Sequence, residues 1–115
     1  MKNLFAISLL GLLLTGCVST PSPLYSWNDY QDQCYNYIKN ETPENLEKLL
    51  KTYQLIINKQ TGSRKVVPPG IYADYGFLLY KQGKKEEGIT YLKKEATLYP
   101  ESAEFILRII KNLEK

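Results

Sequence analysis

Apolar side chains recur at spacings of three and four along nearly the whole chain after residue 26. This periodicity places them on one face of an α-helix, whereas a half-buried strand needs an apolar residue at every second position. No stretch keeps that alternation long enough to predict a strand. Proline and glycine separate the periodic segments at Pro43, Gly70, Gly83 and Pro100. The sequence therefore predicts an all-α fold of about five helices, arranged as antiparallel hairpins.

The helix boundaries follow from capping signals. Ser26 can cap the first helix, and Thr42 followed by Pro43 and Glu44 is a strong start signal for the second. Gly62 is a natural end for that second helix. The predicted helical segments are 26–40, 42–62, 69–82, 84–99 and 100–113, with a loop over 61–69. The side chains predicted to face the core are Trp27, Tyr30, Cys34, Tyr37, Ile38, Leu46, Leu49, Leu50, Tyr53, Ile56, Ile57, Tyr72, Tyr75, Gly76, Leu79, Gly88, Ile89, Leu92, Ala96, Leu98, Ile106, Ile109, Ile110 and Leu113.

The first 17 residues have the organisation of a bacterial export signal. Lys2 supplies the positive charge, and segment 4–14 is apolar apart from Ser8 and Gly11. As a helix this segment rises only about 16 Å, well short of a hydrocarbon core of about 30 Å. Leu14-Thr15-Gly16-Cys17 then has the form of a lipobox, which is cut before the cysteine and acylated on its thiol. An ordinary cleaved signal with a coincidental cysteine is the alternative.

The lipobox predicts three parts: a signal peptide over 1–16, lipidated Cys17 with a flexible tether over 17–25, and a helical domain over 26–115. Each buried acyl CH₂ contributes about 0.8 kcal/mol, so several acyl chains on Cys17 would hold the protein on the membrane. Val18 is not the aspartate that favours inner-membrane retention, which predicts an outer-membrane protein facing the periplasm if the source is Gram-negative. Prolines in the tether favour polyproline II, so residues 18–24 reach about 20 Å.

Composition argues against several function classes. The formal net charge is +3, or +2 without the predicted signal peptide, which gives no argument for a nucleic-acid partner. There is no histidine, so the commonest general base and metal ligand is missing. No metal, phosphate-binding or nucleophile motif of known spacing is present. We therefore expect no enzymatic activity, no metal and no cofactor.

Cys34 is the one cysteine left once Cys17 carries lipid. In an oxidising compartment it has no partner for an intramolecular disulfide. Its place in the apolar stripe of the first predicted helix favours a small buried side chain. An intermolecular disulfide or a reactive thiol stays open as an alternative.

Residues 72–100 resemble a tetratricopeptide repeat, in which paired helices stack at a period near 34 residues. The matching positions are Tyr72, Tyr75, Gly76, Leu79, Tyr80 and Pro100. The resemblance implies a right-handed α-α superhelix and close packing of two helices through Gly76 and Gly88. Glu95 stands where the pattern has a small residue, so we expect weaker packing or a solvent-facing side chain there. A degenerate earlier copy begins at Trp27.

The chain from Tyr25 to Leu113 is similar to a family of small bacterial lipoproteins catalogued as domain-of-unknown-function family 4810. The similarity rests on Tyr25-Ser26-Trp27, on residues 67–73 and on Tyr99-Pro100-Glu101-Ser102. It implies an outer-membrane lipoprotein whose gene often lies beside those of other lipoproteins, including relatives of the curli-export pore. It implies no catalytic residue.

A tetratricopeptide hairpin turns the side chains of its first helix toward a concave surface, so the resemblance also implies a partner-binding groove. The predicted groove residues are Asn28, Asp32, Tyr35, Asn36, Ala73, Phe77, Tyr80 and Lys81. Tyr35, Phe77 and Tyr80 are of the aromatic type that often anchors protein interfaces. Cover of this groove by the last helix is the alternative.

We therefore expect a protein–protein interaction or assembly module at the bacterial cell envelope, with a protein partner such as another envelope lipoprotein. The alternative is a structural subunit of a lipoprotein complex linked to a curli-export-like pore. Arg64 and Lys65 in the loop over 61–69 are expected to be solvated. A role against acidic headgroups or an acidic partner is the alternative for these two side chains.

Overall fold

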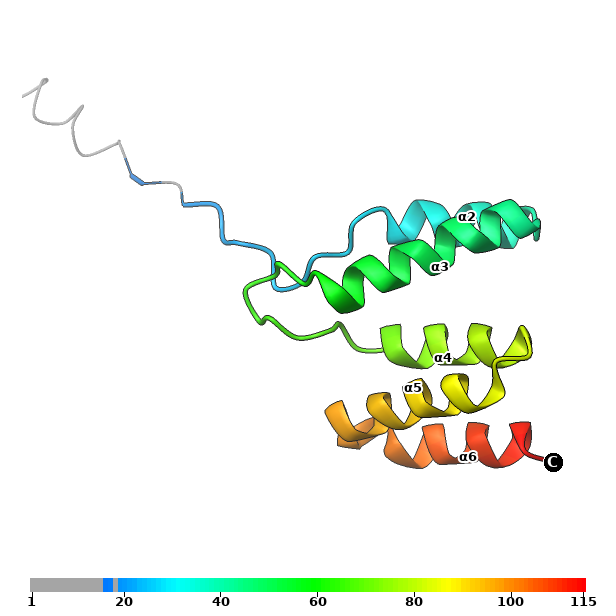
Figure 1. The fold of residues 1–115 in the computed structure, drawn as a ribbon. Coiled ribbons are helices and arrows are strands. Elements are labelled where there is room, and N and C mark those ends of the chain that lie inside the picture. Colours follow the sequence, from blue (N-terminus) through cyan, green and yellow to red (C-terminus); the bar gives the residue numbers. More distant parts are fainter. Residues whose placement is uncertain (1–15, 18) are drawn as a thin grey trace, which may run out of the picture.

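The computed structural model describes residues 16–17 and 19–115, and Figure 1 shows their arrangement. These residues form five α-helices and one short 3-10 helix, with no strand among them. The elements are α2 (Tyr30–Lys39), α3 (Pro43–Asn58), α4 (Ile71–Lys81), α5 (Lys85–Leu98), η1 (Pro100–Ser102) and α6 (Ala103–Leu113). The prediction of an all-α fold of about five helices is confirmed. Residues 1–15 of the predicted export signal lie outside the described residues.

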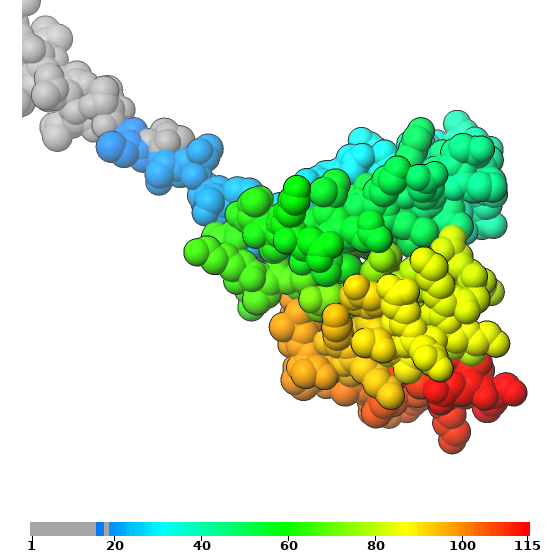
Figure 2. All heavy atoms as spheres, viewed as in Figure 1, coloured from blue at the N-terminus to red at the C-terminus, as the bar shows by residue number. Residues whose placement is uncertain are grey.

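The helices are stacked as antiparallel neighbours (Figure 1). The first pair is α2 with α3, the second pair is α4 with α5, and α6 packs on α5. The contact between α3 and α4 joins the two pairs. Figure 2 shows the same molecule in space-filling form, with the chain after Cys17 entering the domain beside the loop that follows α3.

The start of α3 is the one that the sequence predicts. The hydroxyl of Thr42 accepts a hydrogen bond from the backbone N–H of Asn45 at 3.2 Å, and Pro43 occupies the first turn. The helix ends earlier than predicted, at Asn58, so Gly62 is not its C-terminal stop. Gly62 is instead buried against the backbone of Leu24 and Tyr25. A Cβ at this position would clash with both residues.

The start of α2 differs from the prediction. The helix begins at Tyr30 and the residue before it is Asp29, whose carboxylate accepts hydrogen bonds from Gln33 (2.8 Å) and Thr52 (2.9 Å). These bonds hold the pKa of Asp29 below its usual value. Ser26 is not an N-cap, because its backbone and hydroxyl contact the side chain of Gln60 in the loop after α3. The polar contacts of the domain therefore begin before α2.

The predicted inward face of α2 is only partly covered. Ile38 was predicted to face the core, but 76% of it is exposed, and no residue of α2 is fully buried. The physical reason is that α2 is the outermost helix and packs mainly against α3. Leu98, at the end of α5, and Trp27, before α2, are also exposed rather than inward-facing.

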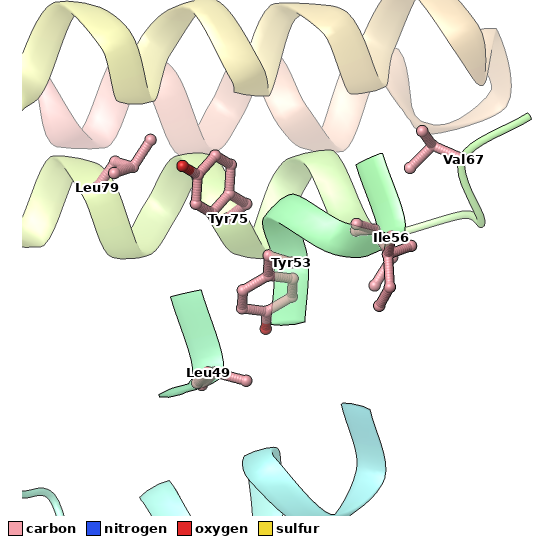
Figure 3. Close-up of a cluster of buried hydrophobic side chains, with 7 residues drawn as sticks. Leu49, Tyr53, Ile56, Val67, Tyr75 and Leu79 are labelled. Atoms are coloured by element: carbon pink, nitrogen blue, oxygen red, sulfur yellow. The ribbon is translucent and has the colours of Figure 1, made fainter. Parts of the chain in front are cut away.

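Two hydrophobic clusters hold the stack together. The larger cluster joins α3, the following loop and α4, and Figure 3 draws it. Its buried members are Leu49, Tyr53, Ile56, Val67, Ile71, Tyr75 and Leu79. The smaller cluster joins α5 to α6 through Leu92, Ile106 and Ile110. Most of the predicted inward faces of α3, α4, α5 and α6 are therefore confirmed.

Aromatic rings form a continuous chain from the N-terminal segment to α5. Neighbouring rings have centroids 4.7 to 6.1 Å apart. The chain runs through Tyr25, Trp27, Tyr30, Tyr53, Tyr75, Tyr91 and Tyr72. Aromatic pairs of this kind contribute about 0.5–1.5 kcal/mol each beyond their buried area. The chain uses six of the ten tyrosines, which explains why so small a domain holds so many.

The pairing of α4 with α5 depends on two glycines. A Cβ on Gly76 would lie 2.6 Å from the carbonyl oxygen of Gly88, and a Cβ on Gly88 would lie 2.5 Å from that of Gly76. The predicted close approach of the two helices through these residues is confirmed.

Glu95 has a different role from the one expected. It is 2% exposed, and its Oε1 accepts a hydrogen bond from the backbone N–H of Gly70 at 2.7 Å. Gly70 is the N-cap residue of α4, with a φ of 92°, and it has no side chain that could cap the helix. Glu95 therefore caps α4 from the neighbouring helix, where its charge also suits the helix dipole. Burial raises the pKa of Glu95 despite this hydrogen bond.

Candidate functional site

A groove opens between α2, α3 and α4, with a volume of about 310 Å³. We call it the α2–α4 groove. Its lining residues are Tyr30, Cys34, Tyr37, Ile38, Leu49, Tyr53, Asp74, Phe77 and Leu78. Most of them are apolar or aromatic, which is typical of a surface that binds another molecule by burying area. The groove exists because α2 leaves part of its apolar face uncovered beside α4.

One polar contact crosses the floor of the groove. The hydroxyl of Tyr30 donates to Oδ2 of Asp74 at 3.1 Å. Burial raises the pKa of Tyr30 and, even more, that of Tyr53 beside it, so both phenols are neutral at physiological pH. Asp74 keeps an exposed edge, yet the packing around its carboxylate removes enough water to raise its pKa, an effect that the bond from Tyr30 opposes. This contact therefore joins α2 to α4.

Large apolar side chains stand exposed at the rim. Ile38 and Tyr35 lie on the C-terminal half of α2, and Phe77 lies opposite on α4 with 40% of its surface exposed. The ammonium of Lys39 lies 5.9 Å from the ring centroid of Tyr35, and that of Lys81 lies 5.8 Å from the centroid of Phe77. The rim thus offers aromatic and aliphatic anchors next to two positive charges.

The structure separates the predicted groove residues into two groups. Phe77 lines the groove and Lys81 lies over its ring. By contrast, Ala73 packs on the cluster shared by α5 and α6, and the hydroxyl of Tyr80 donates to the carbonyl of Leu113 at 2.6 Å. The last helix therefore ties down these two side chains on the other side of α4.

The predicted residues on the first helix are all exposed. Asp32, Tyr35 and Asn36 lie on α2, and the carbonyl of Asn36 accepts a hydrogen bond from the side chain of Asn45. Asn28 precedes α2 with a φ of 50°. None of these four lines the groove, and Tyr35 is the large aromatic side chain among them.

Several groove residues were assigned to the core by the sequence analysis. The helical stripe of α2 predicted Tyr30, Cys34, Tyr37 and Ile38 as buried, but it could not show that α2 has a neighbour on one side only. Asp74 was not singled out at all. An acidic residue one position before the Tyr75-Gly76 pair is a weak signal, and its contact with Tyr30 is visible only in the tertiary structure.

The cysteines of the described chain are not joined to each other. Cys34 is half-buried in the wall of the groove, and Cys17 is exposed at the start of the described chain. Within residues 16–17 and 19–115, no three potential metal ligands lie close enough to hold an ion. None of the helices in the same part of the chain is both long and apolar enough to cross a membrane.

A second feature lies where the N-terminal segment meets the domain. The backbone N–H groups of Ser63 and Arg64 donate to the carbonyls of Pro23 (3.0 Å) and Leu24 (3.1 Å). The N–H of Thr61 donates to the hydroxyl of Ser26 at 3.0 Å. We call these contacts the tether clamp. They extend the domain to Pro23, ahead of the boundary that the sequence predicts at residue 26.

The described residues thus form a small all-α domain of paired helices with a largely apolar groove between α2, α3 and α4. The chain belongs to the family described as a domain of unknown function, DUF4810, whose model matches residues 24–109. This match begins within the tether clamp and ends in α6. No curated protein and no solved structure is significantly similar to the chain.

Proposed function

We propose that this protein is an outer-membrane lipoprotein, acylated on Cys17, whose helical domain binds another envelope protein through the α2–α4 groove. The lipobox at Leu14-Thr15-Gly16-Cys17 supports the anchor, because the pattern stands at the end of an apolar export segment. The resemblance of residues 72–100 to a tetratricopeptide repeat supports the binding role. The protein acts by contact and has no catalytic role.

The observation that carries the binding role is the uncovered apolar surface around the groove. Tyr35, Ile38 and Phe77 expose large apolar side chains on facing helices, and the hollow between the helices is deep enough to receive a side chain. Interface anchors are commonly aromatic or large aliphatic residues that fill such hollows. Lys39 and Lys81 at the rim favour a partner segment that has a carboxylate beside its apolar side chains.

The groove is tested by site-specific photocrosslinking in intact cells. A photoreactive amino acid replaces Ile38 in the groove, Phe105 on the outer face of α6, or Lys111 as a matched exposed control. We expect position 38 to give a discrete adduct with one envelope protein, and position 111 to give none. The substitution Phe77→Ala should reduce that adduct severalfold, while the thermal melt of the purified variant stays that of a folded protein. A lack of any adduct at position 38 would contradict the groove.

The anchor is tested separately by intact-mass measurement of the membrane-extracted protein. We expect a chain that begins at Cys17 and carries a diacylglyceryl group, and an unmodified mass with release to the periplasm for Cys17→Ser. An unmodified thiol at Cys17 in the wild-type protein would refute the anchor without affecting the groove.

The structural-subunit alternative is favoured by one observation. Phe105 is 66% exposed and Leu107 is 58% exposed, and both lie on α6, which the groove does not include. A lateral contact through α6 would suit a lipoprotein complex linked to a curli-export-like pore. In the crosslinking experiment, a discrete adduct at position 105 and none at position 38 would favour this role.

A further inference from the structure

We propose that the surface around the tether clamp, formed by residues 23–27 and 59–65, lies against anionic lipid headgroups, so that the anchored domain stands on the membrane by this end. This inference rests on the proposed lipid anchor at Cys17. The clamp leaves only residues 18–22 between the acylated cysteine and the domain. At about 3.1 Å per residue in polyproline II, these five residues reach roughly 16 Å. The surface around the clamp is therefore the part of the domain that is held nearest to the bilayer.

The clamp makes this attachment directional. Gly62 lacks the Cβ that would clash with Leu24 and Tyr25, so the two backbone segments lie in contact. The N–H groups of Ser63 and Arg64 can then donate hydrogen bonds to the N-terminal segment. The guanidinium of Arg64 donates to the hydroxyl of Tyr25 at 2.9 Å and lies 5.6 Å from its ring centroid. These contacts fix the point at which the tether enters the domain.

The charge of this surface has a single sign. Residues 16–28 and 59–70 contain Lys59, Arg64 and Lys65 and no acidic residue, and all three basic side chains are exposed. Each base near an anionic membrane surface gains attraction that is worth roughly a fivefold change in binding, within a Debye length of about 8 Å. The acidic side chains Glu101 and Glu104 lie beyond Tyr99, in η1 and the first turn of α6, and Glu104 is paired with Arg108.

Apolar side chains accompany the charges. Leu24 is 58% exposed and Trp27 is 41% exposed, although each lies in a segment held to the domain. Tryptophan and tyrosine favour the membrane–water interface, where an apolar ring meets a wet polar edge. A surface that carries an exposed tryptophan and three bases thus favours contact with a lipid headgroup layer.

Lys65 adds a conformational observation. Its φ is 53°, in the left-handed region that costs a non-glycine residue about 1–2 kcal/mol. A glycine would adopt this turn, which the N–H of Lys65 closes onto the carbonyl of Gly62, at a lower cost. The side chain of Lys65 is exposed in this turn.

The exposed anchors of the groove lie away from the clamp. The chain enters at the N-terminal ends of α2 and α4, whereas Ile38 and Phe77 lie in the last turn of α2 and the second half of α4 (Figure 1). A domain that stands on its clamp end therefore holds Ile38 and Phe77 away from the membrane, where a partner protein can reach them.

The single tryptophan of the chain is Trp27, so its fluorescence reports on this surface alone. The lipidated protein is reconstituted into vesicles of phosphatidylethanolamine and phosphatidylglycerol that contain brominated phospholipid, and Trp27 emission is compared with that in vesicles of phosphatidylcholine. We expect a blue shift and strong quenching in the anionic vesicles, and little of either in the neutral ones or at 1 M salt.

Charge variants test the cause. Lys59→Gln with Lys65→Gln should reduce the quenched fraction severalfold, since each base contributes roughly fivefold. Lys111→Gln with Lys115→Gln removes the same charge at the far end of the molecule and should leave quenching unchanged. Equal quenching in all variants and lipids would overturn the proposal, as would an unshifted Trp27 emission in anionic vesicles, which is the result expected if this surface faces water or a protein. Intact mass measured on the same sample shows whether the acyl anchor is present, so a failed contact and a failed anchor are told apart.

Discussion

Gly70, the N-cap residue of α4, has no side chain that could cap the helix. The carboxylate that accepts a hydrogen bond from its N–H comes from Glu95, 25 residues further along the chain. The sequence pattern marks Glu95 as a misfit on α5, because a small residue is usual there in the repeat that the segment resembles. The structure gives it a use: the buried carboxylate satisfies a helix terminus that no local residue caps. Its Oε2 has no hydrogen-bond partner in the described chain, so the cap is obtained at a cost in desolvation.

The first prediction concerns this cap. Glu95→Ala should lower the free energy of unfolding by about 1–2 kcal/mol, because a buried N–H loses its acceptor. Glu95→Gln keeps an acceptor oxygen and removes the buried charge, so it should be at least as stable as the wild type. In thermal melts, a difference of about 1 kcal/mol corresponds to roughly 4–8 °C for a domain of this size. Equal melting temperatures for the two variants would contradict the cap.

The second prediction is the pH dependence of the same residue. Burial raises the pKa of Glu95 above the 4.5 of a free side chain, so the folded state binds the proton more tightly than the unfolded state. The protonated carboxyl group of Glu95 therefore adds stability that is complete below pH 4.5 and is lost as the pH rises through the folded-state pKa. Glutamine does not titrate, so we expect the free energy of unfolding of Glu95→Gln to exceed that of the wild type by a growing amount as the pH rises over that range. Urea titrations at a series of pH values measure this gap, and a constant gap would refute the assignment.

At the scale of the helices, α4 and α5 are held closest together, and α2 is held least. The closeness of α4 and α5 comes from Gly76 and Gly88, whose missing side chains let each backbone contact the other. The looseness of α2 comes from its outer position, which leaves Ile38 exposed and opens the groove. Two helices with similar apolar stripes therefore end in different environments.

The third prediction tests the α4–α5 contact. Alanine is normally better than glycine within a helix by about 1 kcal/mol. Gly88→Ala should nevertheless destabilise the fold by about 1–3 kcal/mol, because its Cβ would meet the backbone of α4. Thr90→Ala on the exposed face of the same helix is the matched control and should change stability by less than about 0.5 kcal/mol. Chemical denaturation measures both, and a stabilised Gly88→Ala variant would show that the helices are further apart than described.

At the scale of the whole molecule, the tether clamp lies before α2, whereas the exposed groove residues Ile38 and Phe77 lie further along α2 and α4. The loop that carries the clamp also contacts the end of the second helix pair, since the hydroxyl of Tyr99 donates to the carbonyl of Val67 at 2.6 Å. Burial and a hydrogen bond with Tyr25 raise the pKa of Tyr99 to about 12, so this phenol keeps its proton at physiological pH. The entry point of the chain is thus fixed relative to both pairs.

The fourth prediction tests the clamp. Gly62→Ala places a Cβ against the backbone of Leu24 and Tyr25 and should release residues 23–26 from the loop. We expect the amides of Ser63 and Arg64 to exchange their hydrogens at least tenfold faster than in the wild type, since each 1.4 kcal/mol lost from local opening is about tenfold. Ser63→Ala keeps the backbone N–H and serves as the control. Unchanged protection in Gly62→Ala would show that the segment is not held by this contact.

The sequence by itself determined the all-α class, the number of helices, the start of α3 and the inward faces of α3 to α6. Those features depend on periodicity and on capping residues close in the chain, which are local properties. Tertiary structure alone decided three things: the cover on each face of α2, the partner of Glu95 and the contact of Gly62 with Leu24. Each depends on which distant segment lies alongside, and an apolar stripe looks the same whether a neighbouring helix covers it or leaves it open as a groove.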